Sequence, residues 1–432
     1  MLNKIKNKIL RTVHSLLYNS LKKKTKKFYL NNYEVDNRLV DKLLDDVLKC
    51  AISNVPYYHG YTADLGSFPV VDKSIYQEVG EKQFLHINNM RVGYYKMNTG
   101  GSTGEPFEFY RDVRTGIVDN FHQEFQHKNM GFGDNDVLIV FNGCEISSNL
   151  TDNNIFWKKK NEKQLPFGSV EFSTHYLNRG NAQYYLDEIL TIAPSYIRAY
   201  PSAMCELTII LCELGYTIRP FEVKGIQLSS EVCSDAQKEM LIKYWGDVIY
   251  FQYGHSEAAA IASSYPNETG YVFSPYYGLV EILDDDGVHV GQGETGKIVV
   301  TSFHNFARPM IRYDTGDMAV FDETHKHVTR VKQIIGREQD FVIDKSENKI
   351  SVTSLIFGQH FKAFKNIINW QVVNRSPGKL QVRIIKGENW TISDTQEIKE
   401  KLSFNNSFDV EVVFLLEIEK TKSGKNKLVV GF

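Results

Sequence analysis

Asn98-Thr99-Gly100-Gly101-Ser102-Thr103-Gly104-Glu105-Pro106 is the stretch from which the rest of the sequence is best interpreted. Its three glycines allow positive φ, so the backbone can approach a bulky anion closely. Successive N–H groups in such a turn can converge on that anion. The hydroxyl groups of Thr99, Ser102 and Thr103 can each donate a hydrogen bond to phosphate oxygens. The stretch therefore predicts a phosphate-binding loop.

Alternating residues flank this loop at 92–97 and 107–110, which indicates a hairpin with the loop at its tip. The loop is not of the Walker A type, because no Lys-Ser or Lys-Thr pair follows the last glycine. Taken alone, the stretch is equally compatible with a glycine-rich hairpin turn that binds nothing. Motifs further along the chain decide between these alternatives.

Composition excludes several classes of protein. The chain has 432 residues, enough for two or three domains with a large core. Hydrophobic residues make up 42% and the formal net charge is −2, so no overall field attracts nucleic acid and we expect no nucleic-acid partner. The five cysteines form no Cys-x-x-Cys pair, and no apolar run approaches the roughly 18–20 residues of a membrane span. These features predict a cytoplasmic protein with reduced thiols.

Residues 1–33 are strongly polarised, because they carry nine Lys or Arg residues and no acid. Apolar residues recur in this segment at helical spacing. A basic amphipathic helix of this kind can lie on an anionic membrane surface, which predicts a possible peripheral membrane contact. The favoured alternative is a helix whose apolar stripe packs on its own domain.

The middle of the chain reads as alternating helices and strands. Residues 137–141 form a continuous apolar run, typical of a strand buried on both faces, and residues 155–165 read as a surface loop. From about 183 to 251 the alternation indicates parallel sheets with helices on their faces. Ligands of such sheets bind at the carboxyl ends of the strands. Two polar stretches follow strands there, at 228–231 and 252–257.

Two of the downstream motifs place carboxylates beside turns. Glu257 follows a strand in Tyr253-Gly254-His255-Ser256-Glu257, and it is a plausible Mg²⁺ ligand because Mg²⁺ bound with phosphates takes one or two carboxylates. Asp317 ends Arg312-Tyr313-Asp314-Thr315-Gly316-Asp317 and can accept both hydroxyls of a ribose. Either motif alone is equally a solvated turn, since turns favour Gly and Asp.

Two further motifs place basic residues late in the chain. Arg337, in Gly336-Arg337-Glu338-Gln339-Asp340, could bind a phosphate or a ribose, or simply occupy a turn between strands. Lys425 ends Lys420-Thr421-Lys422-Ser423-Gly424-Lys425, a stretch that by itself is typical of a solvated tail. A metal site near Asp322, His325 and His327 is a minor alternative to a polar hairpin tip.

Together these motifs resemble, in the same order, those of the adenylate-forming superfamily of acyl-CoA synthetases, peptide-synthetase adenylation domains and luciferases. The matching patterns are Thr-Gly-Gly-Ser-Thr-Gly-x-Pro, Tyr-Gly-x-Ser-Glu, Gly-Glu-x-Gly-x-Ile-Val-Val-Thr, Arg-Tyr-x-Thr-Gly-Asp, Gly-Arg-x-x-Asp and Ser-Gly-Lys, between residues 98 and 425. Within the superfamily the chain resembles the phenylacetate–CoA ligase-like family, especially its capsular polysaccharide biosynthesis branch. This finer resemblance rests on residues 54–58, 68–73 and 197–203.

The resemblance implies an α/β fold. A large N-terminal domain, residues 1–336, would hold parallel-type sheets flanked by helices and a small β-barrel-like part. A small, mobile α+β domain, residues 337–432, would follow it. The implied enzyme is an adenylate-forming ligase that uses ATP and Mg²⁺ to convert a small-molecule carboxylic acid into an acyl-AMP and pyrophosphate.

The resemblance also implies roles for individual residues. The loop residues Thr99, Gly100, Gly101, Ser102, Thr103 and Gly104 would hold the β- and γ-phosphates. Glu257 would bind Mg²⁺, Ser256 would contact the α-phosphate, and Lys425 would neutralise charge between the carboxylate and the α-phosphate. The nucleotide base would lie beside Ser229, Ser230, Glu231, Tyr253 and Gly254, and the ribose beside Asp317 and Arg337. Tyr200, Ser202 and His255 would border the acyl pocket.

The acceptor of the acyl group is left open. It is either an amine or hydroxyl of a sugar, as expected for capsule or surface polysaccharide, or the thiol of CoA. The chain also departs from the family pattern: Glu105 stands where a lysine is frequent, Asp314 stands where Arg is common, and the Ser-Gly-Lys motif lacks its usual leading Pro and trailing Arg. The loss of a cation at 105 favours a third alternative, a non-catalytic scaffold of polysaccharide assembly.

Overall fold

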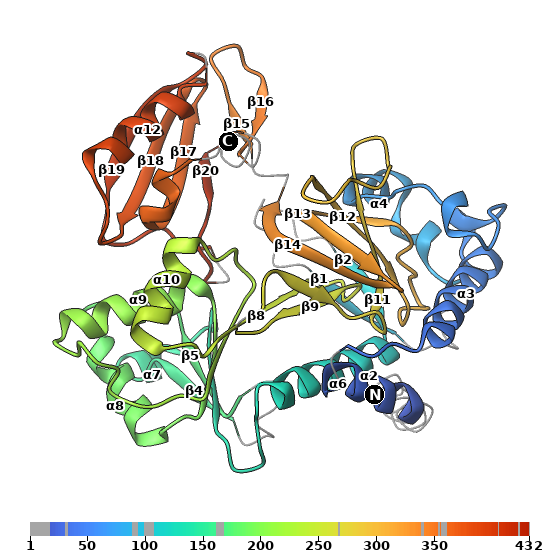
Figure 1. Cartoon of the computed structure of the whole chain (residues 1–432), viewed down its shortest axis with the longest axis horizontal. Coiled ribbons are helices and arrows are strands. Elements are labelled where there is room, and N and C mark those ends of the chain that lie inside the picture. Colours follow the sequence, from blue (N-terminus) through green and yellow to red (C-terminus); the bar gives the residue numbers. More distant parts are fainter. Residues whose placement is uncertain are drawn as a thin grey trace. The chain divides into compact units, whose positions relative to one another are not determined.

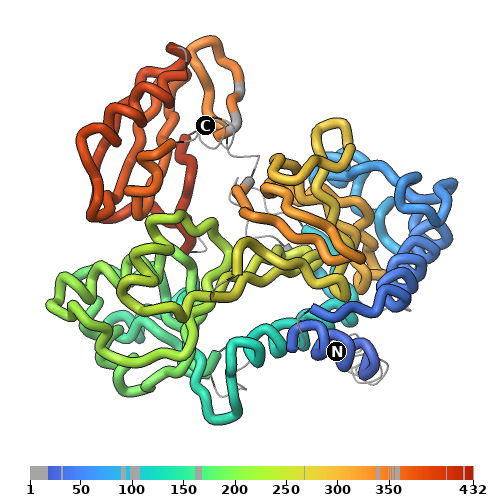
Figure 2. Tube along the Cα trace, viewed as in Figure 1, coloured from blue at the N-terminus to red at the C-terminus, as the bar shows by residue number. Residues whose placement is uncertain are grey.

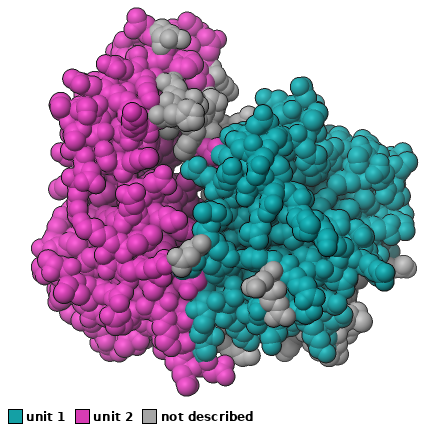
Figure 3. Space-filling model, viewed as in Figure 1, with its two compact units in different colours: residues 1–133, 252–334 teal, residues 134–251, 335–432 magenta. Residues whose placement is uncertain are grey.

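The structure is a computed structural model, and it describes most of the chain. The described residues are 18–30, 33–88, 94–98, 108–160, 168–266, 268–337, 341–352, 355, 361–404, 406–421 and 424–431. The chain divides into two compact units, unit 1 with residues 1–133 and 252–334, and unit 2 with residues 134–251 and 335–432 (Figure 3). Strand β8 (Ile249–Gly254) carries the chain from unit 2 into unit 1. Among the described residues, no helix is both long enough and apolar enough to cross a bilayer.

Aspartate side chains cap helices of unit 1 at their N-termini. The helices of this unit are α2 (Asn19–Leu30), α3 (Asn37–Asn54), α4 (Lys73–Val79) and α6 (Val113–Asn129), with the 3-10 turns η1 (Pro56–Tyr58), η2 (Leu65–Ser67) and η3 (Glu81–Phe84). Asp36 and Asp72 precede α3 and α4, and each carboxylate accepts a backbone N–H of the first turn. Such caps satisfy donors that have no partner inside the helix, so they determine where these helices start.

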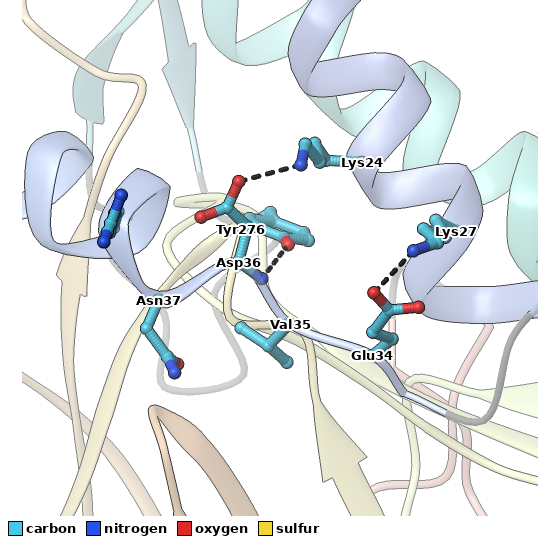
Figure 4. A pocket seen from close by; sticks show the side chains of 8 residues that line it. Lys24, Lys27, Glu34, Val35, Asp36, Asn37 and Tyr276 are labelled. Atoms are coloured by element: carbon cyan, nitrogen blue, oxygen red, sulfur yellow. Dashed lines mark hydrogen bonds and ion pairs between the residues drawn. The ribbon is translucent and has the colours of Figure 1, made fainter.

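Helix α2 belongs to the basic N-terminal segment, of which the structure describes residues 18–30 and 33. It packs on α6 (Figures 1 and 2). Its buried side chains share a hydrophobic cluster with α6; the members are Leu21, Phe28 and Tyr29 with Val118, Phe121 and Phe125. Lys24 and Lys27 pair with Asp36 and Glu34 around a cavity of about 410 Å³ (Figure 4). For residues 19–30 the apolar stripe therefore packs on unit 1. Residues 1–17 lie outside the described residues, and their membrane contact stays a prediction.

The strands of unit 1 are antiparallel. They are β1 (Tyr94–Asn98), β2 (Glu108–Asp112), β9 (Ile261–Ser264), β10 (Tyr271–Phe273), β11 (Gly278–Leu283), β12 (Thr295–Ser302), β13 (Tyr313–His325) and β14 (Val328–Arg337). β1 pairs with β2, from Tyr94 opposite Asp112 to Asn98 opposite Glu108, which confirms the predicted hairpin. Residues 99–107 at its tip, which include all of the predicted phosphate loop except Asn98, lie outside the described residues. The other strands lie in the order β11-β12-β13-β14-β10-β9.

The first part of unit 2 is a parallel sheet covered by helices. Its strands are β3 (Leu138–Asn142), β4 (Trp157–Lys159), β5 (Val170–Ser173), β6 (Tyr196–Ala199) and β7 (Gly225–Ser229), and its helices are α7 (Ser148–Thr151), α8 (Ala182–Ile192), α9 (Pro201–Glu213) and α10 (Asp235–Trp245). β5, β3, β6 and β7 are neighbours in that order and run parallel, as the alternating pattern predicts. One prediction is wrong, because residues 157–159 form β4, antiparallel to β5, instead of a loop.

The C-terminal part of unit 2 is a small α+β sheet. Its elements are β15 (Phe341–Ile343), β16 (Lys349–Ser351), η4 (Ala363–Asn366), β17 (Ile367–Ser376), β18 (Lys379–Lys386), α12 (Ile392–Leu402), β19 (Asp409–Phe414) and β20 (Val429–Gly431). The sheet order is β19-β18-β17-β20, and α12 packs on it through Ile398 and Leu402 (Figure 1). This agrees with the predicted α+β character, while the predicted domain boundary at residue 336 stays a prediction.

Candidate active site

The Tyr253–Glu257 motif begins in the last residues of β8 and ends in a tight turn. The carbonyl of His255 accepts the N–H of Ala258 at 3.0 Å, and Ala258 adopts a left-handed conformation with φ 54°. The turn leaves Ser256 exposed but buries Glu257, of which 8% is exposed. A carboxylate in such a position requires partners, because burying an unpaired charge is costly.

Glu257 has two such partners. Nδ1 of His255 lies 3.1 Å from Oε2, and the hydroxyl of Tyr313 donates to Oε1 at 3.2 Å. Burial, and then the charge of Glu257, hold the pKa of Tyr313 well above its usual value, so Tyr313 remains a donor. These two contacts orient the Glu257 carboxylate, which can only accept hydrogen bonds while it is ionised.

Asp317 lies on β13 directly after Gly316, whose φ of 74° is a left-handed conformation that glycine adopts readily. Its N–H donates to Oγ1 of Thr315 at 3.1 Å, and its Oδ2 accepts the hydroxyl of Tyr253 at 2.8 Å. Burial raises the pKa of Tyr253 well above its usual value, and the neighbouring Asp317 raises it further. Tyr253 therefore stays protonated and donates to the carboxylate.

Unit 1 thus brings four residues of the sequence motifs together, Tyr253, His255, Glu257 and Asp317. The ring centres of Tyr253 and His255 are 6.3 Å apart, and the charges of Asp317 and Glu257 both raise the pKa of Tyr253. Tyr313 joins them, although the sequence reading assigned it no role. No simple pattern identifies it in the sequence, because the pairing of β13 with β12 is irregular between Asp314 and Met318 and the period of two does not run through to Asp317.

In unit 2 the turn after β7 holds a second carboxylate, that of the partly buried Glu231. Ser230 has φ 71°, a left-handed conformation, and it directs the chain back toward α9. Oε2 of Glu231 accepts the N–H of Ser202 at 3.1 Å in the first turn of α9, where the helix dipole favours a negative charge. Oε1 accepts the N–H of Asn426 at 2.7 Å. Burial raises the pKa of this carboxyl, and these hydrogen bonds oppose the effect.

Lys425 lies beside the same turn. Its Nζ is 5.6 Å from the centre of the Tyr200 ring, and its charge acts on Glu231. The preceding Gly424 has φ 74°, and a Cβ there would lie 2.1 Å from Oγ1 of Thr174. Gly424 and Lys425 are therefore packed against other residues of unit 2 and are not part of a solvated tail.

Solved structures share this arrangement of elements. The chain superposes on 2-hydroxyisobutyryl-CoA ligase in the postadenylation state in complex with R3-HIB-AMP, with a TM-score of 0.63 and 15% identity over 92% of this chain and 89% of that chain. The chain has the adenylate-forming ligase fold. The anthranilate CoA ligase AuaEII in complex with anthranoyl-AMP aligns with a TM-score of 0.50 and 15% identity, over 78% of this chain and 66% of that chain.

A curated relative aligns over most of the sequence. Protein CapK of Staphylococcus aureus is 21% identical over 390 residues, which is 85% of this chain and 80% of the relative. No protein-family model matches the sequence. The predicted α/β class and the likeness to adenylate-forming CoA ligases are therefore confirmed at the level of the fold.

In this adenylate-forming ligase fold the predicted site residues fall into two groups. Unit 1 holds Tyr253, Gly254, His255, Ser256, Glu257 and Asp317, and unit 2 holds Tyr200, Ser202, Ser229, Ser230, Glu231 and Lys425. Arg337 ends β14, and its side chain lies outside the described residues, as do Thr99, Gly100, Gly101, Ser102, Thr103 and Gly104. The roles given to all these residues stay predictions.

The minor alternative of a metal site at the β13–β14 hairpin finds no support. Asp322 and His327 line a cavity of about 690 Å³, and His327 pairs with Asp41 at 2.9 Å. Among the described residues, no group of three or more His, Cys, Asp or Glu side chains is arranged to hold a metal ion.

Proposed function

We propose that the chain is an ATP-dependent ligase that converts a carboxylic acid into an acyl-AMP and pyrophosphate and then transfers the acyl group, in capsule or surface polysaccharide biosynthesis. The observation that carries this proposal is the cluster of Tyr253, Glu257 and Asp317. It occurs in a chain with the fold of a ligase seen with an acyl-AMP. The likeness to CapK supports the polysaccharide branch of the sequence resemblance.

In the proposed reaction a carboxylate oxygen attacks the α-phosphorus of ATP. The bond between that phosphorus and the oxygen bridging to the β-phosphate breaks, and pyrophosphate leaves. Asp317 would accept the ribose hydroxyls, and the hydroxyl of Tyr253, which now donates to Asp317, would shift toward the nucleotide. Lys425 would offset the negative charge of the two reacting anions. The protein acts here by positioning and charge stabilisation.

Glu257 fits the requirement for Mg²⁺. Mg²⁺ bound with a nucleotide takes one or two carboxylates and completes its shell with phosphates and water, so a single carboxylate suffices. His255 and Tyr313 fix the orientation of this carboxylate. Bound Mg²⁺ would neutralise charge on the phosphates. Phosphate binding by the loop at 99–104 remains part of the proposal.

The first test is ATP–pyrophosphate exchange with a panel of carboxylic acids. We expect Asp317→Ala to lower kcat/KM for ATP in the exchange reaction by about 10- to 100-fold, which corresponds to the loss of one or two hydrogen bonds to a charged group. Glu257→Gln should lower exchange and raise the Mg²⁺ concentration that half-saturates it. Asp286→Ala, at an exposed hairpin tip, is the matched control. If the rate of ATP–pyrophosphate exchange is unchanged in both Asp317→Ala and Glu257→Gln, the proposed site is wrong.

The acceptor is tested separately, because both alternatives share the first half-reaction. With the acid identified, AMP release is measured with UDP-glucosamine, as an amino-sugar nucleotide, and with CoA. We expect the amino sugar to accelerate release and CoA to leave it unchanged. Acceleration by CoA alone would favour an acyl- or aryl-CoA synthetase. ATP binding without exchange for any acid would favour the non-catalytic scaffold.

A further inference from the structure

The segment 420–426, which carries Lys425, is closed on itself. Lys420 and Asn426 form an isolated antiparallel bridge. The N–H of Thr421 donates to the carbonyl of Lys425 at 2.7 Å, and the N–H of Lys425 donates back to Oγ1 of Thr421 at 3.2 Å. The contacts that hold the two ends of this turn therefore determine the position of Lys425.

The first end is held by an ion pair. Nζ of Lys420 lies 2.6 Å from Oε2 of Glu206 on α9, and it also donates to the carbonyl of Thr174 at 2.8 Å. Both charged side chains are only 19% exposed. Removing one member of such a pair leaves an uncompensated charge in a poorly solvated place, which costs far more than breaking a surface pair.

The second end is held by the carboxylate of Glu231. Its two oxygens accept the N–H of Ser202, in the first turn of α9, and the N–H of Asn426, directly after Lys425. Between the two ends, Oγ1 of Thr174 donates to the carbonyl of Gly424 at 3.0 Å. The turn is thus attached on both sides of Lys425 to the same part of unit 2.

We propose that Glu206, Lys420 and Glu231 form a clamp that places the ammonium group of Lys425 beside Tyr200. They are positioning residues, because they act through Lys425 and not on a reacting atom. The proposal rests on the role proposed above for Lys425 in forming the acyl-AMP. Weakening the clamp should leave the fold intact, release Lys425, and slow only the half-reaction that uses it.

A second ion pair supplies the comparison. Lys243 of α10 pairs with Glu388 in the C-terminal part of unit 2, so it joins the same two parts of the chain as the clamp. Its side chains are 69% and 78% exposed, and exposed pairs contribute little to stability. Glu388→Gln therefore controls for the loss of an ion pair that does not hold the 420–426 turn.

The test compares Glu206→Gln, Lys420→Met and Lys420→Arg with Glu388→Gln in the full chain. The first readout is the rate at which Lys425 is acetylated in a short pulse of acetic anhydride, measured by mass spectrometry. We expect about a tenfold increase in Glu206→Gln and Lys420→Met, a smaller one in Lys420→Arg, and none in the control. Lys427 is the internal reference, because Gln371 of β17 holds its carbonyl at 2.8 Å.

The second readout separates the half-reactions. Exchange should fall about tenfold in Glu206→Gln and Lys420→Met, while consumption of supplied acyl-AMP stays at the wild-type rate. Unchanged labelling of Lys425, or an equal loss of both half-reactions, would overturn the clamp. If the wild-type chain shows no exchange with any acid, the proposed function fails, and the labelling still decides whether the clamp positions Lys425.

Discussion

Replacing Lys425 with alanine should slow acyl-AMP formation by about 100- to 1,000-fold, the usual effect of removing one preorganised charge-stabilising group. A carboxylate that attacks the α-phosphate brings two anions together, and Lys425 is the cation that lies beside Tyr200. Consumption of a supplied acyl-AMP by the acceptor does not require that neutralisation. It should therefore continue at close to the wild-type rate.

The measurement is pre-steady-state AMP formation from ATP and acid, set against AMP release from supplied acyl-AMP. Lys427→Ala is the matched control, because it removes a different lysine, two residues after Lys425 in the sequence. Both rates should be unchanged in that variant. Equal losses of the two half-reactions in Lys425→Ala would instead show that Lys425 supports the structure of the turn, and the proposed role would be wrong.

The strands and helices of this chain were largely predictable, because their signals are local. The apolar run at 137–141 corresponds to β3, and the alternation from 183 to 251 corresponds to the parallel strands β6 and β7 with α8, α9 and α10. The failure at β4 has a physical reason. A three-residue edge strand with two exposed lysines carries the charged residues that protect sheet edges, and such a segment reads as a loop.

The candidate site was predictable only where a motif names its residues. Glu257 and Asp317 follow from their motifs, and the structure adds that Tyr253 and Tyr313 orient them. The sequence does not single out Tyr313, because an aromatic residue in a strand usually belongs to the core. The clamp could not be predicted from the sequence. Glu206 and Lys420 are 214 residues apart, and no local sequence pattern indicates that two charges at that separation form an ion pair.

The stability of the chain should depend strongly on pH because of two buried histidines of unit 1. His122 and His304 are 0% and 3% exposed. Nδ1 of His122 lies 3.1 Å from the hydroxyl of Tyr29, and Nε2 of His304 lies 2.8 Å from the carbonyl of Tyr276. The remaining ring nitrogens, Nε2 of His122 and Nδ1 of His304, have no hydrogen-bond partner among the described residues. A proton on either ring would be poorly solvated.

Burial, opposed by the hydrogen bond to Tyr276 and assisted by the charge of Arg114, lowers the pKa of His304 to about 4. Burial also holds the pKa of His122 well below 6.5, and the charge of His304 acts in the same direction. At these two histidines the unfolded chain therefore binds more protons than the folded chain below pH 6.5. Stability is complete above that value and is lost as the pH falls toward 4, by about 3 kcal/mol for His304 alone.

Urea unfolding at pH 7.5, 6.0, 5.0 and 4.5 measures this loss. The free energy of unfolding should fall steadily below pH 6.5, and His304→Gln should show a weaker dependence on pH even where its stability at pH 7.5 is reduced. His59→Gln, at an exposed position, should keep the wild-type slope. The expected loss is a large fraction of the roughly 5–15 kcal/mol by which native proteins are typically stable, so it should be easy to measure. If the free energy of unfolding of the wild type does not change with pH, or if His304→Gln keeps the wild-type dependence on pH, the prediction is wrong. Either result would mean that the buried imidazole rings become solvated when they are protonated.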